Sequence, residues 1–349
     1  MCTRARRGLA RLGRRRRDLG GRGTPPLNGR ILFIRCARHC QLYTVNPDGT
    51  ALDRVTSEGD NGDADWSPDG TKIAYASTRS GDLTIWISRA DGSHARQLTP
   101  NRRRSDDLWP RFTPDGKRVL FVNCEGDDCD GGIGSVRLDG SHLRPVTPNS
   151  HSSYNLADQS PDGAHMAYMR WHVDGVKMGI YVSDADGSNE QRVSPPRLQG
   201  YLPDWSPTGD RIAFASQVFF DRPSPVLYSV RPDGTDLQQL TKPGFPHADW
   251  APAYSPDGTM LVFNSDVAYD DLCCGDLYTM DADGGPRSAI PLPFDAYDPR
   301  WGTAPLQAAT ASSTAVRTGS DMRTICRAIP FAVRLMPGTC SSWFSSSRR

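Results

Sequence analysis

A short turn phrase, Ser-Pro-Asp-Gly with small variations, returns five times along the 349-residue chain. The glycines that close it lie 46, 47, 46 and 49 residues apart, and they are Gly70, Gly116, Gly163, Gly209 and Gly258. Each copy precedes a short apolar run such as Ile73-Ala74-Tyr75. Self-similarity at this period indicates an array of equal structural units, and it constrains the fold more than any other feature of the chain.

A second phrase, a short apolar strand ending in Asp-Gly, alternates with the first. Its six glycines are Gly49, Gly92, Gly140, Gly187, Gly234 and Gly284. Most copies are followed by a polar stretch ending in a pair such as Val55-Thr56, which we interpret as a fourth strand. Proline presets φ for a turn, glycine accepts positive φ, and Asp-Gly favours a hairpin, so each repeat predicts four short strands. No window has helical periodicity.

The two ends of the array indicate how it closes. The first repeat lacks an opening strand and begins at Arg30-Ile31, whereas Tyr297–Trp301 is an opening strand with no repeat after it. Pairing the two would remove the exposed edges of a linear array. We therefore predict an all-β fold, a six-bladed β-propeller of four-stranded blades over residues 29–305, closed by a C-terminal strand that completes the first blade. An open β-solenoid is the alternative.

Charge is distributed unevenly along the chain. The formal net charge is +1, yet residues 1–30 hold ten Arg and one Asp, and residues 306–349 hold six Arg and one Asp. The body between these tails is therefore acidic, which argues against a nucleic-acid partner. We expect residues 1–28 and 306–349 to be disordered or non-native tails. No apolar run is long enough for a transmembrane helix, and the given start lacks the apolar region of a signal peptide.

The repeated phrase also carries a family resemblance. Trp-Ser-Pro-Asp-Gly-x-x-Ile-Ala-Tyr at residues 66–75, followed by a strand ending in Ala-Asp-Gly at 90–92, resembles the repeat of TolB-type, WD40-like bacterial propellers. The resemblance covers about residues 31–304. It implies a non-enzymatic binding scaffold in the periplasm, on the cell surface or secreted, with a protein or cell-envelope glycan as partner. We expect a monomer.

Strand order assigns the loops to two faces. The 1→2 and 3→4 turns share one face, here called the turn face, and the 2→3 and 4→1 loops share the other, here called the loop face. Irregular loops on a rigid scaffold commonly carry recognition, although plain solvated connections are the alternative. We predict partner contacts on the loop face from Arg102, Arg103, Arg104, Asp106, Asp107, Tyr154, Tyr201, Phe245 and His247.

Repeated tryptophans and aspartates have two interpretations each. Trp66, Trp109, Trp205 and Trp301 are assigned to one repeat position, where packing between blades is favoured over ligand stacking. Asp65, Asp204 and Asp249 are expected at the rim of the central channel. Converging carboxylates suit Ca²⁺, but turn capping or hydrogen bonding to the neighbouring blade is favoured.

Six of the nine cysteines fall in 2→3 loops. We predict disulfides between Cys36 and Cys40 and between Cys124 and Cys129, which would imply an oxidising compartment. A zinc site or crossed disulfides joining the first pair with Cys273 and Cys274 is an alternative, and reduced thiols are another. No cofactor is expected, with Ca²⁺ and Zn²⁺ as the alternatives.

Enzymatic motifs are absent from the sequence. There is no Gly-x-Ser-x-Gly, no His-Glu-x-x-His and no Gly-rich phosphate loop. Related propellers precede the catalytic domain of prolyl-oligopeptidase-like enzymes, and the 44 residues after the predicted propeller are too few for such a domain. An axial-site lyase or hydrolase that uses His151, His172 and His247 is the alternative function.

Overall fold

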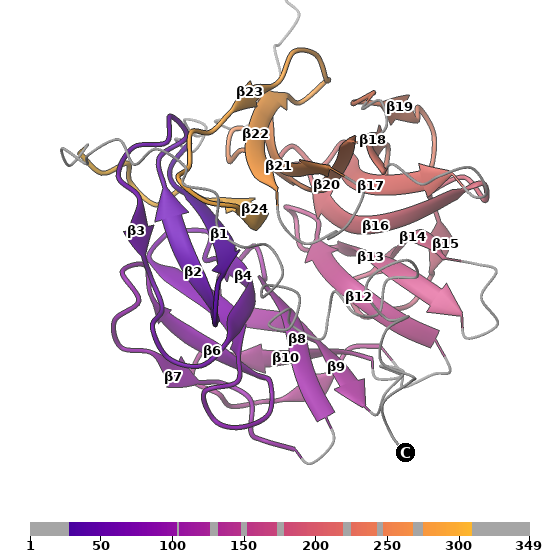
Figure 1. Ribbon diagram of the computed structural model, residues 1–349. Helices are drawn as coiled ribbons and strands as arrows, with labels where there is room; N and C mark the ends of the chain where they lie inside the picture. Colours follow the sequence, from indigo (N-terminus) through magenta and orange to yellow (C-terminus); the bar gives the residue numbers. More distant parts are fainter. Residues whose placement is uncertain are drawn as a thin grey trace, which may run out of the picture.

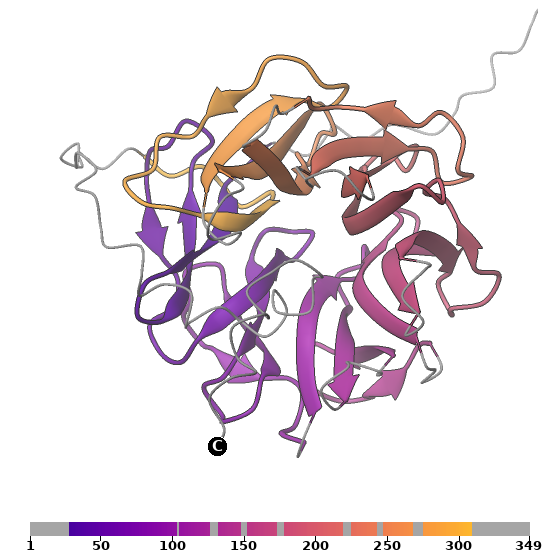
Figure 2. The same cartoon turned by 45° about the vertical axis from the view of Figure 1, so that its right-hand side comes forward.

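The computed structural model describes residues 28–102, 105–125, 132–147, 152–172, 178–218, 225–242, 247–267 and 275–308. These residues form 24 β-strands and no helix, so none of them builds a segment that could cross a membrane as a helix. The strands make six four-stranded antiparallel sheets placed around one axis (Figures 1 and 2). The predicted six-bladed β-propeller is confirmed.

Each blade is a meander counted from the axis outwards. Blades one to three are β24 (Tyr297–Trp301), β1 (Ile31–Cys36), β2 (Cys40–Val45) and β3 (Asp53–Arg54); β4 (Asn61–Trp66), β5 (Lys72–Ser77), β6 (Thr84–Arg89) and β7 (Arg96–Gln97); β8 (Ser105–Phe112), β9 (Arg118–Glu125), β10 (Ile133–Arg137) and β11 (Arg144–Pro145). Blades four to six are β12 (Ser152–Gln159), β13 (His165–His172), β14 (Gly179–Asp184) and β15 (Gln191–Arg192); β16 (Leu198–Trp205), β17 (Ile212–Val218), β18 (Val226–Val230) and β19 (Gln238–Gln239); β20 (His247–Tyr254), β21 (Met260–Val267), β22 (Asp276–Asp281) and β23 (Ser288–Ala289).

The ring closes as the unpaired terminal strands predict. β24 pairs antiparallel with β1, with Ile31 opposite Trp301, so both ends of the array share blade one. The Trp301 indole donates a hydrogen bond of 2.9 Å to the Gly29 carbonyl and fixes this junction. Figure 2 shows β24, at the orange end of the colour bar, beside the indigo strands β1 and β2. Closure leaves no free edge at either end of the array.

The Pro-Asp-Gly turns are each stabilised by internal hydrogen bonds of the same kind. In blade two, Gly70 donates its N–H to the Ser67 carbonyl at 2.8 Å, and the Asp69 carboxylate accepts the Ser67 hydroxyl at 2.6 Å. Gly70 has a φ of 66°, in the left-handed region that glycine accepts without a Cβ penalty. This explains why the phrase is repeated almost without change.

The outermost strands end before the Val-Thr and Leu-Thr pairs that we expected to form them. Blade one ends with Asp53–Arg54, and the following Thr56 hydroxyl accepts the N–H of Leu42 at 2.9 Å. A Thr or Ser at the equivalent position does the same in blades two to five, at 2.8–3.0 Å; these are Thr99, Thr147, Ser194 and Thr241. This Thr or Ser therefore recurs in the repeat because its side chain accepts a hydrogen bond from the third strand, and not because it belongs to the fourth strand.

The core lies between neighbouring blades. One aromatic residue of each second strand is 2% exposed or less, and the set is Phe33, Tyr75, Phe121, Tyr168, Phe214 and Phe263. Five of them stand five residues after the turn glycine, so the repeat period places one large ring in each blade. Burial of rings of this size is a major source of the stability of the array.

Candidate functional site: the axial pocket

Three aspartates of the innermost strands link blades two, four and five to the blade that follows each of them. Asp65, Asp158 and Asp204 occupy the same repeat position, two residues before the Ser of the turn phrase. Their carboxylates accept backbone N–H groups of the following blade, from Phe112 at 2.8 Å and from Trp205 and Tyr254 at 2.7 Å. This is the hydrogen bonding to the neighbouring blade that the sequence favoured over a calcium site.

Asp249, the third predicted channel residue, does not occupy this position. The dipeptide Asp249-Trp250 resembles Asp65-Trp66, but four more residues separate it from the next turn phrase. Its carboxylate is fully buried and forms an ion pair with Arg287 at 3.0 Å. The prediction of a rim position is therefore wrong for Asp249, whereas Asp158 was missed because Gln159 follows it in place of an aromatic residue.

The predicted repeat position is also wrong for Trp109, which, like Asp249, lies too far before the turn phrase. It lies three residues before Phe112, which holds the repeat position of Trp66, Trp205 and Trp301. All four tryptophans are 9% exposed or less and belong to core clusters, consistent with the expected packing between blades.

A β-bulge in the innermost strands brings further charged residues to the axis. Asp63 and Asp298 have φ values of 49° and 48°, and the pairing with the second strand shifts at each of them. A residue in the left-handed conformation inside a strand re-aims the side chains beside it. Burial, and next the charge of Asp298 in the adjacent blade, raises the pKa of Asp63.

The axial cluster consists of carboxyls and guanidiniums from blades one to five. Its members are Asp63, Asp65, Asp158, Asp204, Asp298, Arg111 and Arg300. Arg300 is 3% exposed and lies 3.4 Å from Asp204 and 3.7 Å from Asp298. Arg111 is 2% exposed, and its Nε and Nη2 have no hydrogen-bond partner among the described residues. Five acids against two bases make the cluster acidic when all of them are ionised.

Burial perturbs these acids strongly. It raises the pKa of Asp63 to about 7 and the pKa values of Asp158 and Asp298 to about 6, while the charge of Arg111 opposes each shift. Burial, and next the charge of Asp158, raises the pKa of Asp204 well above its ordinary value. The cluster therefore takes up or releases protons near neutral pH.

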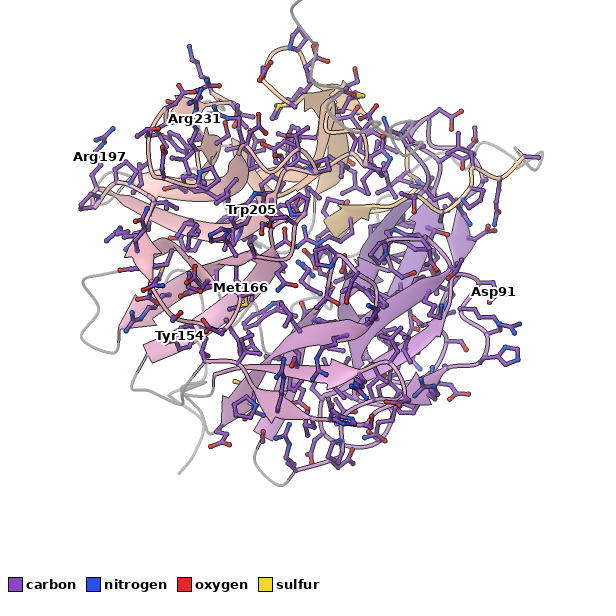
Figure 3. The ribbon with its side chains drawn as sticks, turned by 180° about the vertical axis from the view of Figure 1, so that it is seen from behind. Asp91, Tyr154, Met166, Arg197, Trp205 and Arg231 are labelled. Carbon is purple, nitrogen blue, oxygen red and sulfur yellow. A yellow bond between two sulfur atoms is a disulfide. The ribbon has the colours of Figure 1, made fainter. Side chains whose placement is uncertain are left out.

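A cavity of about 290 Å³ lies over this cluster on the turn face. Asp65, Asp158, Asp204 and Arg300 line it together with the rings of Trp66, Trp205, Tyr254 and Trp301, and prolines of the turns complete its wall. Figure 3 shows Trp205 towards the axis and Asp91 at the periphery. Carboxylates with aromatic rings around them suit a cationic group, which gains from both the charges and the ring faces. We call this cavity the axial pocket.

Metal-ligating side chains do not converge in the part of the chain that the structure describes. Among the described residues, no group of three or more His, Cys, Asp or Glu side chains is arranged to hold a metal ion. His151 lies outside the described residues, and so do the side chains of His172 and His247. The expected histidine set of an axial-site enzyme therefore stays a prediction.

The predicted loop-face contacts are only partly on loops. Asp107, Tyr154 and Tyr201 lie within eight-residue strands β8, β12 and β16 and are 1%, 5% and 2% exposed. Asp106 is half-buried in β8, where it accepts the N–H of Leu83 at 3.1 Å. The expected loop positions of these four residues are wrong, because the innermost strands begin earlier than the sequence indicated.

Arg102 has a structural partner on the loop face. Its guanidinium donates to both carboxylate oxygens of the buried Asp107, at 2.9 and 3.1 Å. Arg103, Arg104 and Phe245 lie outside the described residues, and His247 begins β20. A partner contact through these four residues stays a prediction.

The cysteines of blade one are joined. Cys36 and Cys40 face each other at the end of the β1–β2 hairpin and form a disulfide, as predicted. Cys124 is also disulfide-bonded, while Cys129, Cys273 and Cys274 lie outside the described residues.

Comparison with solved structures identifies the architecture. TolB from Acinetobacter baumannii superposes with a TM-score of 0.64 at 22% identity, over 78% of this chain and 66% of that chain. A putative TolB from Agrobacterium tumefaciens gives 0.59 at 22% identity, over 79% of this chain and 92% of that chain. The fold is that of the TolB-type six-bladed propeller. An oligogalacturonate lyase from Vibrio parahaemolyticus gives 0.51 at 12% identity, over 72% of this chain and 71% of that chain, so this fold also occurs in enzymes.

The relatives found by sequence carry names that point to different functions. An uncharacterised protein of Agrobacterium fabrum is 31% identical over 37% of this chain and 47% of its own length, and an uncharacterised peptidase of Bacillus subtilis is 27% identical over 66% and 32%. The Tol-Pal system protein TolB of Geobacter sulfurreducens is 35% identical over 21% of this chain and 17% of that protein. The chain thus spans less than half of the length of these relatives. No protein-family model matches the sequence.

Proposed function

We propose that the protein is a non-enzymatic, extracytoplasmic binding scaffold that receives a cationic side chain of a protein partner in its axial pocket. The observation that carries this proposal is the composition of the pocket, which Asp65, Asp158 and Asp204 line together with four aromatic residues. Their carboxylates are held by backbone N–H groups, so they need no rearrangement to meet a ligand. Such pre-organisation lowers the entropic cost of binding.

Proton release would accompany binding of the cation. The pKa of Asp158 is raised to about 6 and that of Asp65 is also raised, in both cases mainly by burial. A positive charge beside these groups favours their ionised form, because opposite charges attract more strongly in a partly dry site. The affinity for the partner should therefore increase as the pH rises from 5 to 8.

The extracytoplasmic location is supported by the disulfide between Cys36 and Cys40, because disulfides persist in oxidising compartments. Fold and sequence similarity to TolB proteins, one of which is named for the Tol-Pal system, supports a role in recognition at the cell envelope. The acidic body of the propeller accords with a partner segment rich in Lys or Arg.

The test compares partner capture by the full chain and by charge-only variants. In the double variant Asp65→Asn/Asp158→Asn, the amide oxygens can still accept the interblade hydrogen bonds, and both acidic partners of Arg300 remain. We expect the affinity for the captured protein to fall at least tenfold. The matched control is Asp91→Asn, a turn aspartate at the periphery. Equal affinity of the double variant and the wild type would refute the proposal.

An axial-site hydrolase or lyase is the second candidate. The Asp158 carboxyl lines the axial pocket and burial raises its pKa to about 6, which suits general acid catalysis near neutral pH. Peptidases and a lyase also occur among the similar proteins. Assaying the full chain with peptide and oligogalacturonate substrates tests this candidate. Turnover that disappears in Asp158→Asn would support it over the scaffold.

The loop face needs a separate experiment. Since Arg102 stabilises a buried acid, its replacement would confound binding with folding, so Arg103→Ala/Arg104→Ala is the informative variant. An unchanged partner would remove this loop from the recognition surface.

A further inference from the structure

Five of the six blades carry an aromatic residue just before the Ser or Thr of the turn phrase, or at its equivalent in β24. These rings are Trp66, Phe112, Trp205, Tyr254 and Trp301, and each is 9% exposed or less. Blade four alone has a polar residue there, Gln159, which is half-buried. One position in a set of six equivalent packing positions therefore lacks its ring.

The ring of blade two packs against blade one. A methyl group placed on Gly302, the residue after Trp301 of blade one, would lie 2.4 Å from the indole of Trp66 of blade two. The residue at the repeat position of Gly302 is, in the other blades, the Ser or Thr that opens the turn phrase. At the junction of blades three and four, the pair equivalent to Gly302 and Trp66 is therefore Thr113 and Gln159.

The turns at this junction are also further apart than elsewhere. Methyl groups placed on Gly116, Gly209 and Gly258 would lie 3.7, 3.7 and 3.1 Å from the prolines of the preceding turns. A methyl group on Gly163, in blade four, would meet no atom within 4 Å. Blades three and four are thus not packed together at the turn face as their neighbours are.

A cleft of about 440 Å³ occupies this junction. It is lined by Thr113, Pro114, Asp115, Arg118, Gln159, Pro161, Asp162 and Gly163, none of which lines the axial pocket. Its volume is within the range of ligand pockets in proteins.

One wall of the cleft is suited to a planar ring. Arg118 has the repeat position of His165, and His165 is stacked on the ring of Trp205 in the next blade, with centroids 6.5 Å apart and planes 28° apart. The Arg118 guanidinium is held by the Ser135 hydroxyl at 2.9 Å and the His142 carbonyl at 2.7 Å. A guanidinium fixed in this way can stack on an aromatic face.

We propose that this cleft is a binding site for an aromatic side chain, Trp or Tyr, of a protein partner. The incoming ring takes the place that a native ring holds at the other junctions, with Arg118 on one side and Pro114 and Pro161 beside it. The Gln159 amide nitrogen donates to the Gly163 carbonyl at 3.3 Å, and its second N–H and its oxygen supply a donor and an acceptor for the peptide that carries the ring. Buried aromatic anchors of this kind dominate the energetics of many interfaces.

The test uses N-acetyl-L-tryptophanamide as the probe and the full chain as the receptor. We expect saturable, millimolar binding to the wild type by ligand-observed NMR, and no saturable binding of N-acetyl-L-leucinamide. In Gln159→Trp and Gln159→Phe the chain supplies its own ring, so we expect probe binding to disappear. Filling the cleft should also raise Tm by about 2–4 °C.

Gln159→Ala is the matched control, because it leaves the cleft open. It should bind the probe within a few-fold of the wild type and show no rise in Tm. Absence of saturable binding to the wild type, or unchanged binding in both ring-filling variants, would overturn the proposal. A fall in Tm in both ring-filling variants would do the same, because it would mean that the junction has no room for a ring. None of these readouts depends on the axial pocket, so failure here is separable from failure of the proposed function.

Discussion

Replacing the buried acid Asp63 by Asn should stabilise the propeller at neutral and alkaline pH. Asp63 is 7% exposed. Its burial, together with repulsion from Asp298, raises its pKa from 3.8 to about 7. Asn has nearly the same shape, tolerates the positive φ found here, and carries no charge. The substitution therefore removes the cost of ionisation and little else.

The size of the effect follows from the pKa shift. A carboxyl whose pKa is raised on folding binds more protons in the folded state, so its contribution is favourable below the unfolded pKa and is lost as the pH rises to the folded pKa. One unit corresponds to about 1.4 kcal/mol, so a shift of about three units sets an upper limit near 4 kcal/mol. Relaxation of the channel reduces this limit, and we expect Asp63→Asn to gain about 2–4 kcal/mol at pH 8 relative to pH 4.

Urea unfolding at several pH values between 4 and 8 measures this gain as the difference between variant and wild type. The control is Asp91→Asn at an exposed turn, where hydrogen bonds from Ser93 lower the pKa below its ordinary value of 3.8. That contribution is lost only at pH values below this range, so the curves of Asp91→Asn and wild type should run parallel between pH 4 and 8. Parallel stability curves of Asp63→Asn and wild type across this range would show that the acid is not held in a desolvated site, and the reasoning would be refuted.

Three further outcomes are expected. Arg102→Ala should lower the free energy of unfolding by about 2–4 kcal/mol, because it leaves the buried Asp107 without its ion pair. Circular dichroism during urea unfolding measures this loss, and a loss below about 0.5 kcal/mol would contradict the prediction. Reduction of the bond between Cys36 and Cys40 should cost about 2 kcal/mol, estimated from the short loop that it closes; unfolding with and without reductant reports it, and identical midpoints would count against a role in stability. Thr56→Val should cost about 1–3 kcal/mol through a buried N–H left unpaired, with Thr50→Val on an exposed turn as the control.

The fold could be predicted almost completely from the sequence, because it depends on local turn chemistry repeated at a fixed period. Gly70 and its equivalents mark every first turn, and the unpaired segments at Ile31 and Tyr297 indicate closure. The site could be predicted only in part. Asp65 and Asp204 follow from the repeat, whereas Asp249 belongs to a dipeptide that only resembles the repeat and lies four residues too early.

Residues of the axial cluster show why sequence spacing alone was insufficient. Arg111 and Arg300 replace aspartate at their repeat position. Counting back two residues from the turn phrase at Thr113 identifies Arg111, and the position just before Trp301 identifies Arg300. Asp63 and Asp298 reach the axis because of the bulge in the innermost strands. A bulge depends on pairing with the second strand, and no local motif in this chain announces it.

The sequence by itself determined the blades, their number and their order around the ring, since turns and strand alternation act over a few residues. Tertiary structure alone decided which charges meet at the axis and which junction between blades stays open. Gln159 illustrates the difference: in the sequence it is one polar residue in an imperfect repeat, while in the folded ring it is a missing side chain between two blades. The physical reason is that local geometry is encoded within each repeat, but burial, pKa shifts and cavities arise only where side chains from different repeats come together.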